Sequence, residues 1–153
     1  MLKPLIYNSD IKQIEKKAKI GSISIDEAAL LRQAKWSELT IQQACKNMFR
    51  GRFGSKAKFI QTDNSRATKF QRMRAGLGGY EEGATDAYLV GKNTVFFVEF
   101  KKIGSPSEIE PRPAQIEMNK FLLDCGHKAF FCNNTVYFEK VICEEFAKSI
   151  LDK

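Results

Sequence analysis

Residues 94–102, Thr-Val-Phe-Phe-Val-Glu-Phe-Lys-Lys, constrain the fold of this 153-residue chain more than any other stretch. The run is apolar and β-prone, yet it ends with a Glu and a Lys two positions apart. Because residues i and i+2 of a strand face the same side, Glu99 and Lys101 project together, while Val98 and Phe100 face the opposite way. The sequence therefore predicts a strand that presents two charges at one end of an otherwise apolar sheet.

The preceding residues 83–90, Gly-Ala-Thr-Asp-Ala-Tyr-Leu-Val, predict the first strand of a β-hairpin. A two-residue loop at Lys92 and Asn93 pairs Asp86 with Glu99, and a four-residue loop over 91–94 gives the same pairing. A three-residue loop instead places Asp86 opposite Val98. Directly opposed residues have Cβ atoms about 4.5–5.5 Å apart, and like charges in such positions are destabilising.

Two carboxylates held this closely favour a cation between them. Their hard oxygen atoms suit Mg²⁺ or Mn²⁺, to which the backbone carbonyl of Phe100 could add a further ligand. Lys101, on the same face, could position a water molecule or hold a phosphate. The alternative is a surface ion pair between Glu99 and Lys101, which would contribute little.

Positive charge is concentrated in one part of the chain. The formal net charge is +7, and residues 46–74 contain nine Lys or Arg residues and one acid, a local balance of +8. A local excess interleaved with aromatic residues favours contact with nucleic acid, although a solvated basic face is the alternative. The candidate DNA-binding residues are Arg50, Arg52, Lys56, Lys58, Arg66, Lys69, Arg72 and Arg74.

The chain contains four cysteines and one histidine, with no C-x-x-C pair, which disfavours a structural zinc site. Each cysteine lies in an apolar run, so buried, reduced thiols are expected. The N-terminus lacks the apolar core of a signal peptide, and no apolar run is long enough to span a membrane. We therefore expect a soluble, cytoplasmic protein.

The remaining elements combine helices with strands, an order that fits an α/β fold. The domain boundary is expected after residue 36, with a helical extension over 1–36 that could serve a partner or a dimer mate, and one domain over 37–153. Helices are expected over 9–20, 25–35, 38–50, 114–125 and 141–151, and further strands over 128–132 and 135–138. The helix at 114–125 should bury Ala114, Met118, Phe121, Leu122 and Cys125.

Three further residues have two interpretations each. Glu38 shares the apolar face of its helix, so it is either an acid favoured by the helix dipole or a carboxylate aimed at the site. Gln115 is either a good first-turn residue or a side chain that reaches the site edge. His127 lacks a sequence-level partner for acid–base chemistry and is interpreted as structural or exposed.

Residues 76–132 resemble the PD-(D/E)xK nuclease superfamily, especially its virus-type replication-repair (VRR-NUC) branch. The resemblance is carried by Gly83-Ala84-Thr85-Asp86, Glu99-Phe100-Lys101 and Gln115, with Thr85 where the family usually has Pro. It implies an α/β fold in which helices flank a mixed central sheet, with an αβββαβ core resembling that of restriction endonucleases. It also implies metal ligation by Asp86 and Glu99, a catalytic Lys101 and a supporting Gln115. Glu38 corresponds to an acid that the family often carries on its first core helix, where it would be a further metal ligand.

The resemblance implies a Mg²⁺- or Mn²⁺-dependent DNA endonuclease that acts on branched, flapped or junction DNA in replication, repair or recombination. A bacterial or phage setting and a homodimer are implied in the same way. The alternatives are a non-catalytic nucleic-acid-binding module on a degenerate nuclease fold, and a small basic interaction protein.

Overall fold

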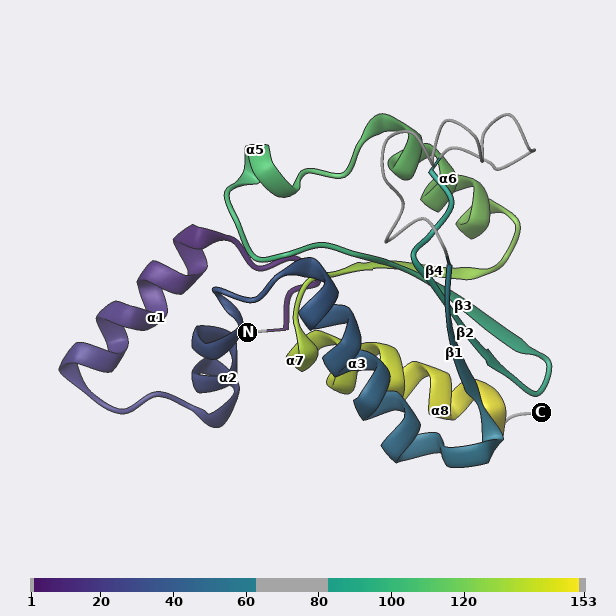
Figure 1. Cartoon of the computed structure of the whole chain (residues 1–153), viewed down its shortest axis with the longest axis horizontal. Helices are drawn as coiled ribbons and strands as arrows, with labels where there is room; N and C mark the ends of the chain where they lie inside the picture. The colour runs from purple at the N-terminus through teal and green to yellow at the C-terminus, as the bar shows by residue number, and fades with distance from the viewer. Residues whose placement is uncertain (1, 63–82, 152–153) are drawn as a thin grey trace.

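The computed structural model describes residues 2–62 and 83–151. Its strands are β1 (Lys58–Gln61), β2 (Ala87–Gly91), β3 (Thr94–Phe100) and β4 (Lys128–Cys132). Its helices are α1 (Asn8–Ile20), α2 (Ile25–Gln33), α3 (Glu38–Phe53), α5 (Pro106–Ile109), α6 (Pro113–Asp124), α7 (Thr135–Tyr137) and α8 (Glu144–Leu151), with a 3₁₀ turn at Gly54–Lys56 and a π-helical segment at Phe138–Cys143. Figure 1 shows these elements in place.

The four strands form one mixed sheet in the order β1-β2-β3-β4. β1 and β3 are both antiparallel to β2, whereas β4 is parallel to β3. The segment from β3 to β4 contains α5 and α6, since a parallel pair requires a long crossover. The main elements between α3 and β4 follow the order α3-β1-β2-β3-α6-β4, which is the expected αβββαβ order. The short helix α5 is an addition within the crossover. The predicted α/β class, with a mixed sheet flanked by helices, is confirmed.

The hairpin has the two-residue loop. Gly91 pairs with Thr94 and Ala87 with Val98, so Lys92 and Asn93 form the turn, and the next step of the ladder places Asp86 opposite Glu99. Asn93 has φ 54°, a left-handed conformation that Asn tolerates better than most residues. Of the two registers that the sequence left open, the hairpin has the one that places Asp86 opposite Glu99, and the three-residue loop is excluded.

Helices cover the two faces of the sheet unequally. α3 and α8 pack on one face, which we call the inner face, and α6 lies over β4 on the other, the outer face (Figure 1). The main apolar core lies between the inner face and its helices. At its centre, Phe49 of α3 contacts the rings of Phe59 and Phe146. The inner face thus carries most of the apolar core, whereas α6 covers the outer face on its β4 side.

The segment predicted as a strand at 135–138 is helical, and that prediction was wrong. The side chain of Asn134 accepts a hydrogen bond from the backbone N–H of Tyr137 at 2.8 Å, which caps a helix instead of ending a turn. The helical turn places Val136 in one apolar cluster and Phe138 in another, so the β-prone composition is overridden by packing. The closing helical region accordingly starts at 135 instead of 141.

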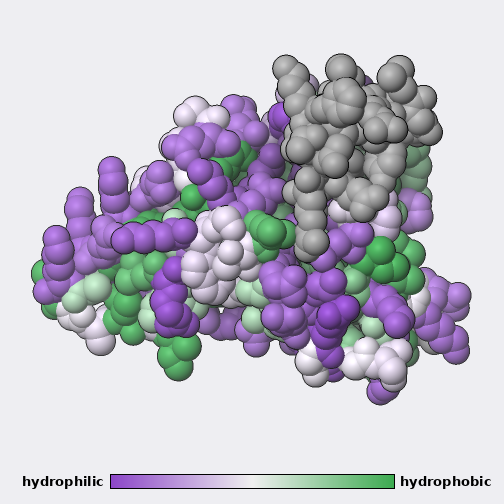
Figure 2. All heavy atoms as spheres, viewed as in Figure 1, coloured by the Kyte–Doolittle hydropathy of each residue, from purple (hydrophilic) through white to green (hydrophobic). Residues whose placement is uncertain are grey.

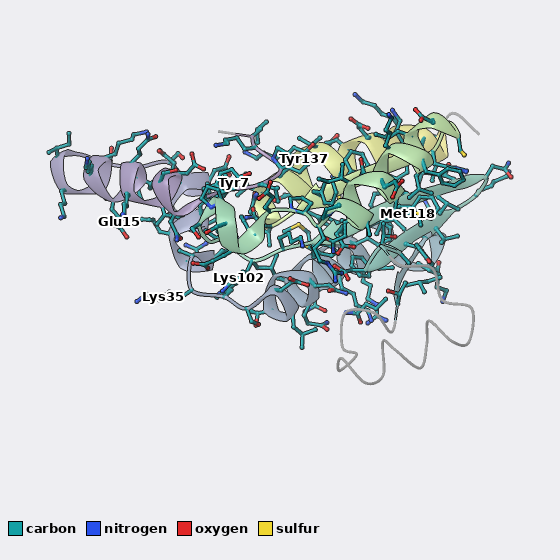
Figure 3. The ribbon with its side chains drawn as sticks, turned by 90° about the horizontal axis from the view of Figure 1, so that it is seen from above. Tyr7, Glu15, Lys35, Lys102, Met118 and Tyr137 are labelled. Atoms are coloured by element: carbon teal, nitrogen blue, oxygen red, sulfur yellow. The ribbon has the colours of Figure 1, made fainter. Side chains whose placement is uncertain are left out.

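The predicted buried stripe of α6 is partly wrong. Leu122 is buried, and Ala114 and Met118 are half-buried, but Phe121 is 60% exposed and Cys125 is exposed. Figure 3 looks down on α6 and labels Met118. α6 touches the sheet mainly over β4, so only one narrow side of the helix is covered. The other three cysteines are buried free thiols, as expected.

The first 36 residues share a second, small apolar cluster with the body of the protein. Ile6, Ile14 and Leu30 are buried there, together with Ile103 and Val136 from the body of the protein. α1 and α2 extend to one side of the sheet (Figures 1 and 3), and hydrophilic side chains cover much of the surface of this part in Figure 2. Among the helices of residues 2–62 and 83–151, none combines the length and apolarity needed to cross a bilayer.

Asn133 fastens the N-terminal segment to the end of β4. Its buried side chain accepts from Ile6 N–H at 2.8 Å and donates to the carbonyl oxygens of Ile6 at 2.7 Å and Lys102 at 3.1 Å. One amide therefore pairs three buried or half-buried backbone groups from two distant segments.

We predict that Asn133→Ala lowers the free energy of unfolding by about 2–4 kcal/mol, because each buried group left unpaired costs about 1–3 kcal/mol. Urea unfolding followed by circular dichroism measures this. Asn47→Ala, on the exposed surface of α3, is the control and should change stability by less than about 0.5 kcal/mol. Equal effects of the two substitutions would refute this role for Asn133.

Candidate active site

Asp86 and Glu99 meet at the end of the hairpin. Both are 5% exposed, and the backbone N–H of Asp86 donates to Oε2 of Glu99 at 3.1 Å. Oδ2 of Asp86 in turn accepts from the N–H of Phe100 at 2.9 Å. Each carboxylate is thus oriented by the other strand of the hairpin, and the predicted pair is in place.

Gln115 connects the acid pair to Lys101. Its Nε2 donates to Oε1 of Glu99 at 2.6 Å, and its Oε1 accepts from Nζ of Lys101 at 2.9 Å. The same Oε1 accepts from the backbone N–H of Arg112 at 2.9 Å, which fixes the amide at the first turn of α6. Both interpretations of Gln115 therefore hold at once, because it caps its helix and reaches the site.

Gly83 allows α6 to approach the first strand. Its φ is +84°, and a Cβ at this position would lie 2.4 Å from the carbonyl oxygen of Ala114. Only glycine fits both the backbone conformation and the space. Gly83 thus allows Gln115 to reach the carboxylates. Thr85, two residues after Gly83, is buried. Its backbone carbonyl oxygen accepts a hydrogen bond from the Thr62 hydroxyl at 2.9 Å.

The two carboxyl groups have perturbed acidities. Burial and the adjacent charge of Asp86 raise the pKa of Glu99 to about 9, against the opposing charge of Lys101. Burial also raises the pKa of Asp86, opposed by the hydrogen bond from Phe100 N–H and by the positive charges of Lys101 and Arg112. Two buried acids that cannot both ionise hold a proton between them. A divalent cation can take the place of that proton, so the donor set fits Mg²⁺ or Mn²⁺.

Glu38 acts on this pair from α3, because its charge contributes to the raised pKa of Glu99. The described residues contain no group of three or more His, Cys, Asp or Glu side chains arranged to hold a metal ion. Two protein carboxylates are nevertheless enough for Mg²⁺, which keeps several of its waters. One turn along α3, Gln42 is fully buried, and neither of its side-chain polar atoms has a hydrogen-bond partner.

Sequence reasoning missed Arg112 as a charge that acts on the site, and Gln42 as a buried polar residue of α3. Arg112 precedes the Pro-initiated α6, and its charge acts on Asp86 once α6 docks. A basic residue at the start of a predicted helix next to Gln115 was the available signal for Arg112. Gln42 gave a weaker one, as a polar residue beside the apolar stripe of α3.

The described candidates for DNA binding do not gather at the carboxylates. Arg50 and Arg52 lie in the last turn of α3, about 18–21 Å along the helix from Glu38 at 1.5 Å per residue. Arg52 pairs with Glu144 at 2.8 Å. Lys56 and Lys58 are exposed beyond that helix. Four further candidates lie outside the described residues: Arg66, Lys69, Arg72 and Arg74. His127 is exposed and packs against the ring of Phe97, in line with its structural or surface interpretation.

No family model matches this sequence, and no curated protein matches it significantly.

The raised pKa of Glu99 makes the stability of the metal-free protein depend on pH. A carboxyl whose pKa is higher in the folded state binds its proton more tightly there and thereby stabilises the fold. This contribution to the free energy of unfolding is complete below pH 4.5 and is lost as pH rises towards about 9. Between pH 5 and pH 9 in EDTA, we expect the free energy of unfolding of the wild type to fall by more than about 1.4 kcal/mol relative to that of Glu99→Gln. This difference is the equivalent of a shift of one pKa unit. Urea unfolding of both proteins across this range measures the difference. Parallel pH profiles would show that Glu99 titrates normally.

Proposed function

We propose that this protein is a Mg²⁺- or Mn²⁺-dependent DNA endonuclease that hydrolyses phosphodiester bonds. The observation that carries the proposal is the buried pair of Asp86 and Glu99, joined through Gln115 to Lys101. A buried like-charge pair is costly to stability, and such arrangements occur most often where their chemistry is used. The alternative of a binding module without catalysis does not account for a lysine held beside these acids.

Asp86 and Glu99 would hold the cation. The backbone carbonyl of Phe100, the last residue of β3, is a candidate further ligand. When bound, the cation neutralises phosphate charge and lowers the pKa of a water ligand. Lys101 is the charged group of the site that can contact a phosphate oxygen or orient an attacking water, and Gln115 fixes the position of its Nζ atom. Gln115 is therefore a positioning residue, and Lys101 is the proposed catalytic one.

The proposed substrate is structured or double-stranded DNA, with branched, flapped or junction forms preferred. Support for DNA comes from the local +8 balance of residues 46–74 and from the exposed Arg50, Lys56 and Lys58. The preference for branched forms and the proposed homodimer rest on the resemblance to VRR-NUC nucleases. A dimer would supply two sites for two strands.

The purified protein should cut linear, flapped or four-way DNA in Mg²⁺ or Mn²⁺ and lose this activity in EDTA. Glu99→Ala and Lys101→Met should each lower the cleavage rate by about a hundredfold or more, a loss typical of removing one group that stabilises the transition state. Gel assays with labelled DNA measure the rates.

Glu117→Gln is the matched control, because Glu117 is an exposed acid on α6. It should leave the rate within about twofold of the wild type. Cleavage that survives Glu99→Ala would assign the activity to another site or a contaminant. A wild type that binds DNA without cutting it in either metal would remove the enzyme proposal.

A further inference from the structure

Among the residues that the structure describes, the outer face of the sheet is open on the side away from β4. α6 covers the β4 side, where Ala129 is buried, but Ile60 on β1 is 44% exposed and Val95 on β3 is 37% exposed. Hydrophobic side chains reach the surface beside the strands at the right of Figure 2. A sheet face with apolar side chains in contact with solvent is a common place for a ligand.

Two aromatic rings lie side by side on this open face. Tyr88 and Phe97 are directly paired across the hairpin, and their ring centroids are 5.3 Å apart at 77°. Both side chains are half-buried, so part of each ring reaches solvent. Ile60 pairs with Tyr88 on the neighbouring strand and completes a row across three strands. We call these three residues the aromatic row, after the two rings of Tyr88 and Phe97 that lie beside Ile60.

The aromatic row lies one step from the carboxylates on the same face of the sheet. Glu99 follows Phe97 by two residues and Asp86 precedes Tyr88 by two, and side chains two residues apart share a face. The step is about 6.6–6.8 Å along the strands. A base adjoining a phosphate at Asp86 and Glu99 is therefore within reach of the row.

The next row on this face carries a cation. Lys58 pairs with Val90, which pairs with Val95, so the Lys58 side chain shares the face and lies one step beyond the aromatic row. It is exposed and forms no ion pair with any residue in the ranges that the structure describes. Acid pair, aromatic row and lysine thus form a line that matches the phosphate, base and further phosphate of an extended strand.

We infer that the aromatic row stacks an unpaired base next to the phosphate bound at the acid pair. The inference rests on the proposed function and extends it by assigning single-stranded nucleotides to a specific surface. An unpaired base presents its flat face to such a row, whereas the bases of a duplex are covered by their neighbours. Stacking on an aromatic side chain contributes about 1–3 kcal/mol per base.

Binding can be measured apart from cleavage by using Glu99→Gln as the background. A fluorescent 12-nucleotide dT strand is the probe, with a duplex of equal length and a strand of abasic sites for comparison. Adding Phe97→Leu or Tyr88→Leu keeps apolar bulk but removes the ring, and each should weaken dT binding about 5- to 150-fold with duplex affinity unchanged. The abasic strand should bind the background protein as weakly as dT binds the Leu variants. Phe97→Trp should restore dT binding.

Phe121→Leu is the control, since Phe121 is an exposed ring on α6 that is not part of the aromatic row. It should leave dT affinity unchanged. Equal losses for dT and duplex, or an abasic strand that binds as well as dT, would overturn the inference. So would a dimer in sedimentation that Phe97→Leu dissociates, because a second copy would then occupy the face. A protein that stacks dT on this row yet cuts no DNA would refute the nuclease and leave the inference standing.

Discussion

The juxtaposition of two buried acids at the end of one hairpin is the constraint on which this structure depends. Asp86 and Glu99 are brought together by a two-residue turn that leaves no freedom in the ladder between them. The main core on the inner face holds β2 and β3 in this register, because a slip by one residue would turn Leu89 and Phe96 out to solvent. The unfavourable contact is thus maintained by favourable packing elsewhere in the same two strands.

The crossover connection from β3 to β4 supplies Gln115, which links the acid pair of the hairpin to Lys101. Gly83 lets the first turn of α6 approach the start of β2, and Gln115 then bonds Glu99 and Lys101 with one amide. A hydrogen-bonded amide lowers the cost of the buried charges and fixes their geometry. At the far end of β4, Asn133 ties the N-terminal segment to the strand beyond Lys101. The helical extension therefore packs against the same strand end that carries the site.

The sequence was sufficient for the site where the information was local. Strand alternation placed Glu99 and Lys101 on one face. The pairing of Asp86 with Glu99 depended on a loop length that the sequence left open and that the structure shows to be two residues. The sequence failed where tertiary packing decides. β1 was not predicted, because its four residues alternate too briefly among basic neighbours, and residues 135–138 became helical through the Asn134 cap. The exposure of Phe121 likewise depends on how little of α6 meets the sheet.

Whether the acid pair of Asp86 and Glu99 is a divalent cation site is tested most directly by calorimetric titration of the metal-free protein with Mn²⁺ at pH 7. In two buffers of different ionisation enthalpy, we predict saturable binding with release of about one proton per Mn²⁺, because the cation displaces the proton that Glu99 holds. Glu99→Gln should abolish the proton release and weaken the binding. Absence of Mn²⁺ binding, or binding that Glu99→Gln leaves unchanged, would contradict the account.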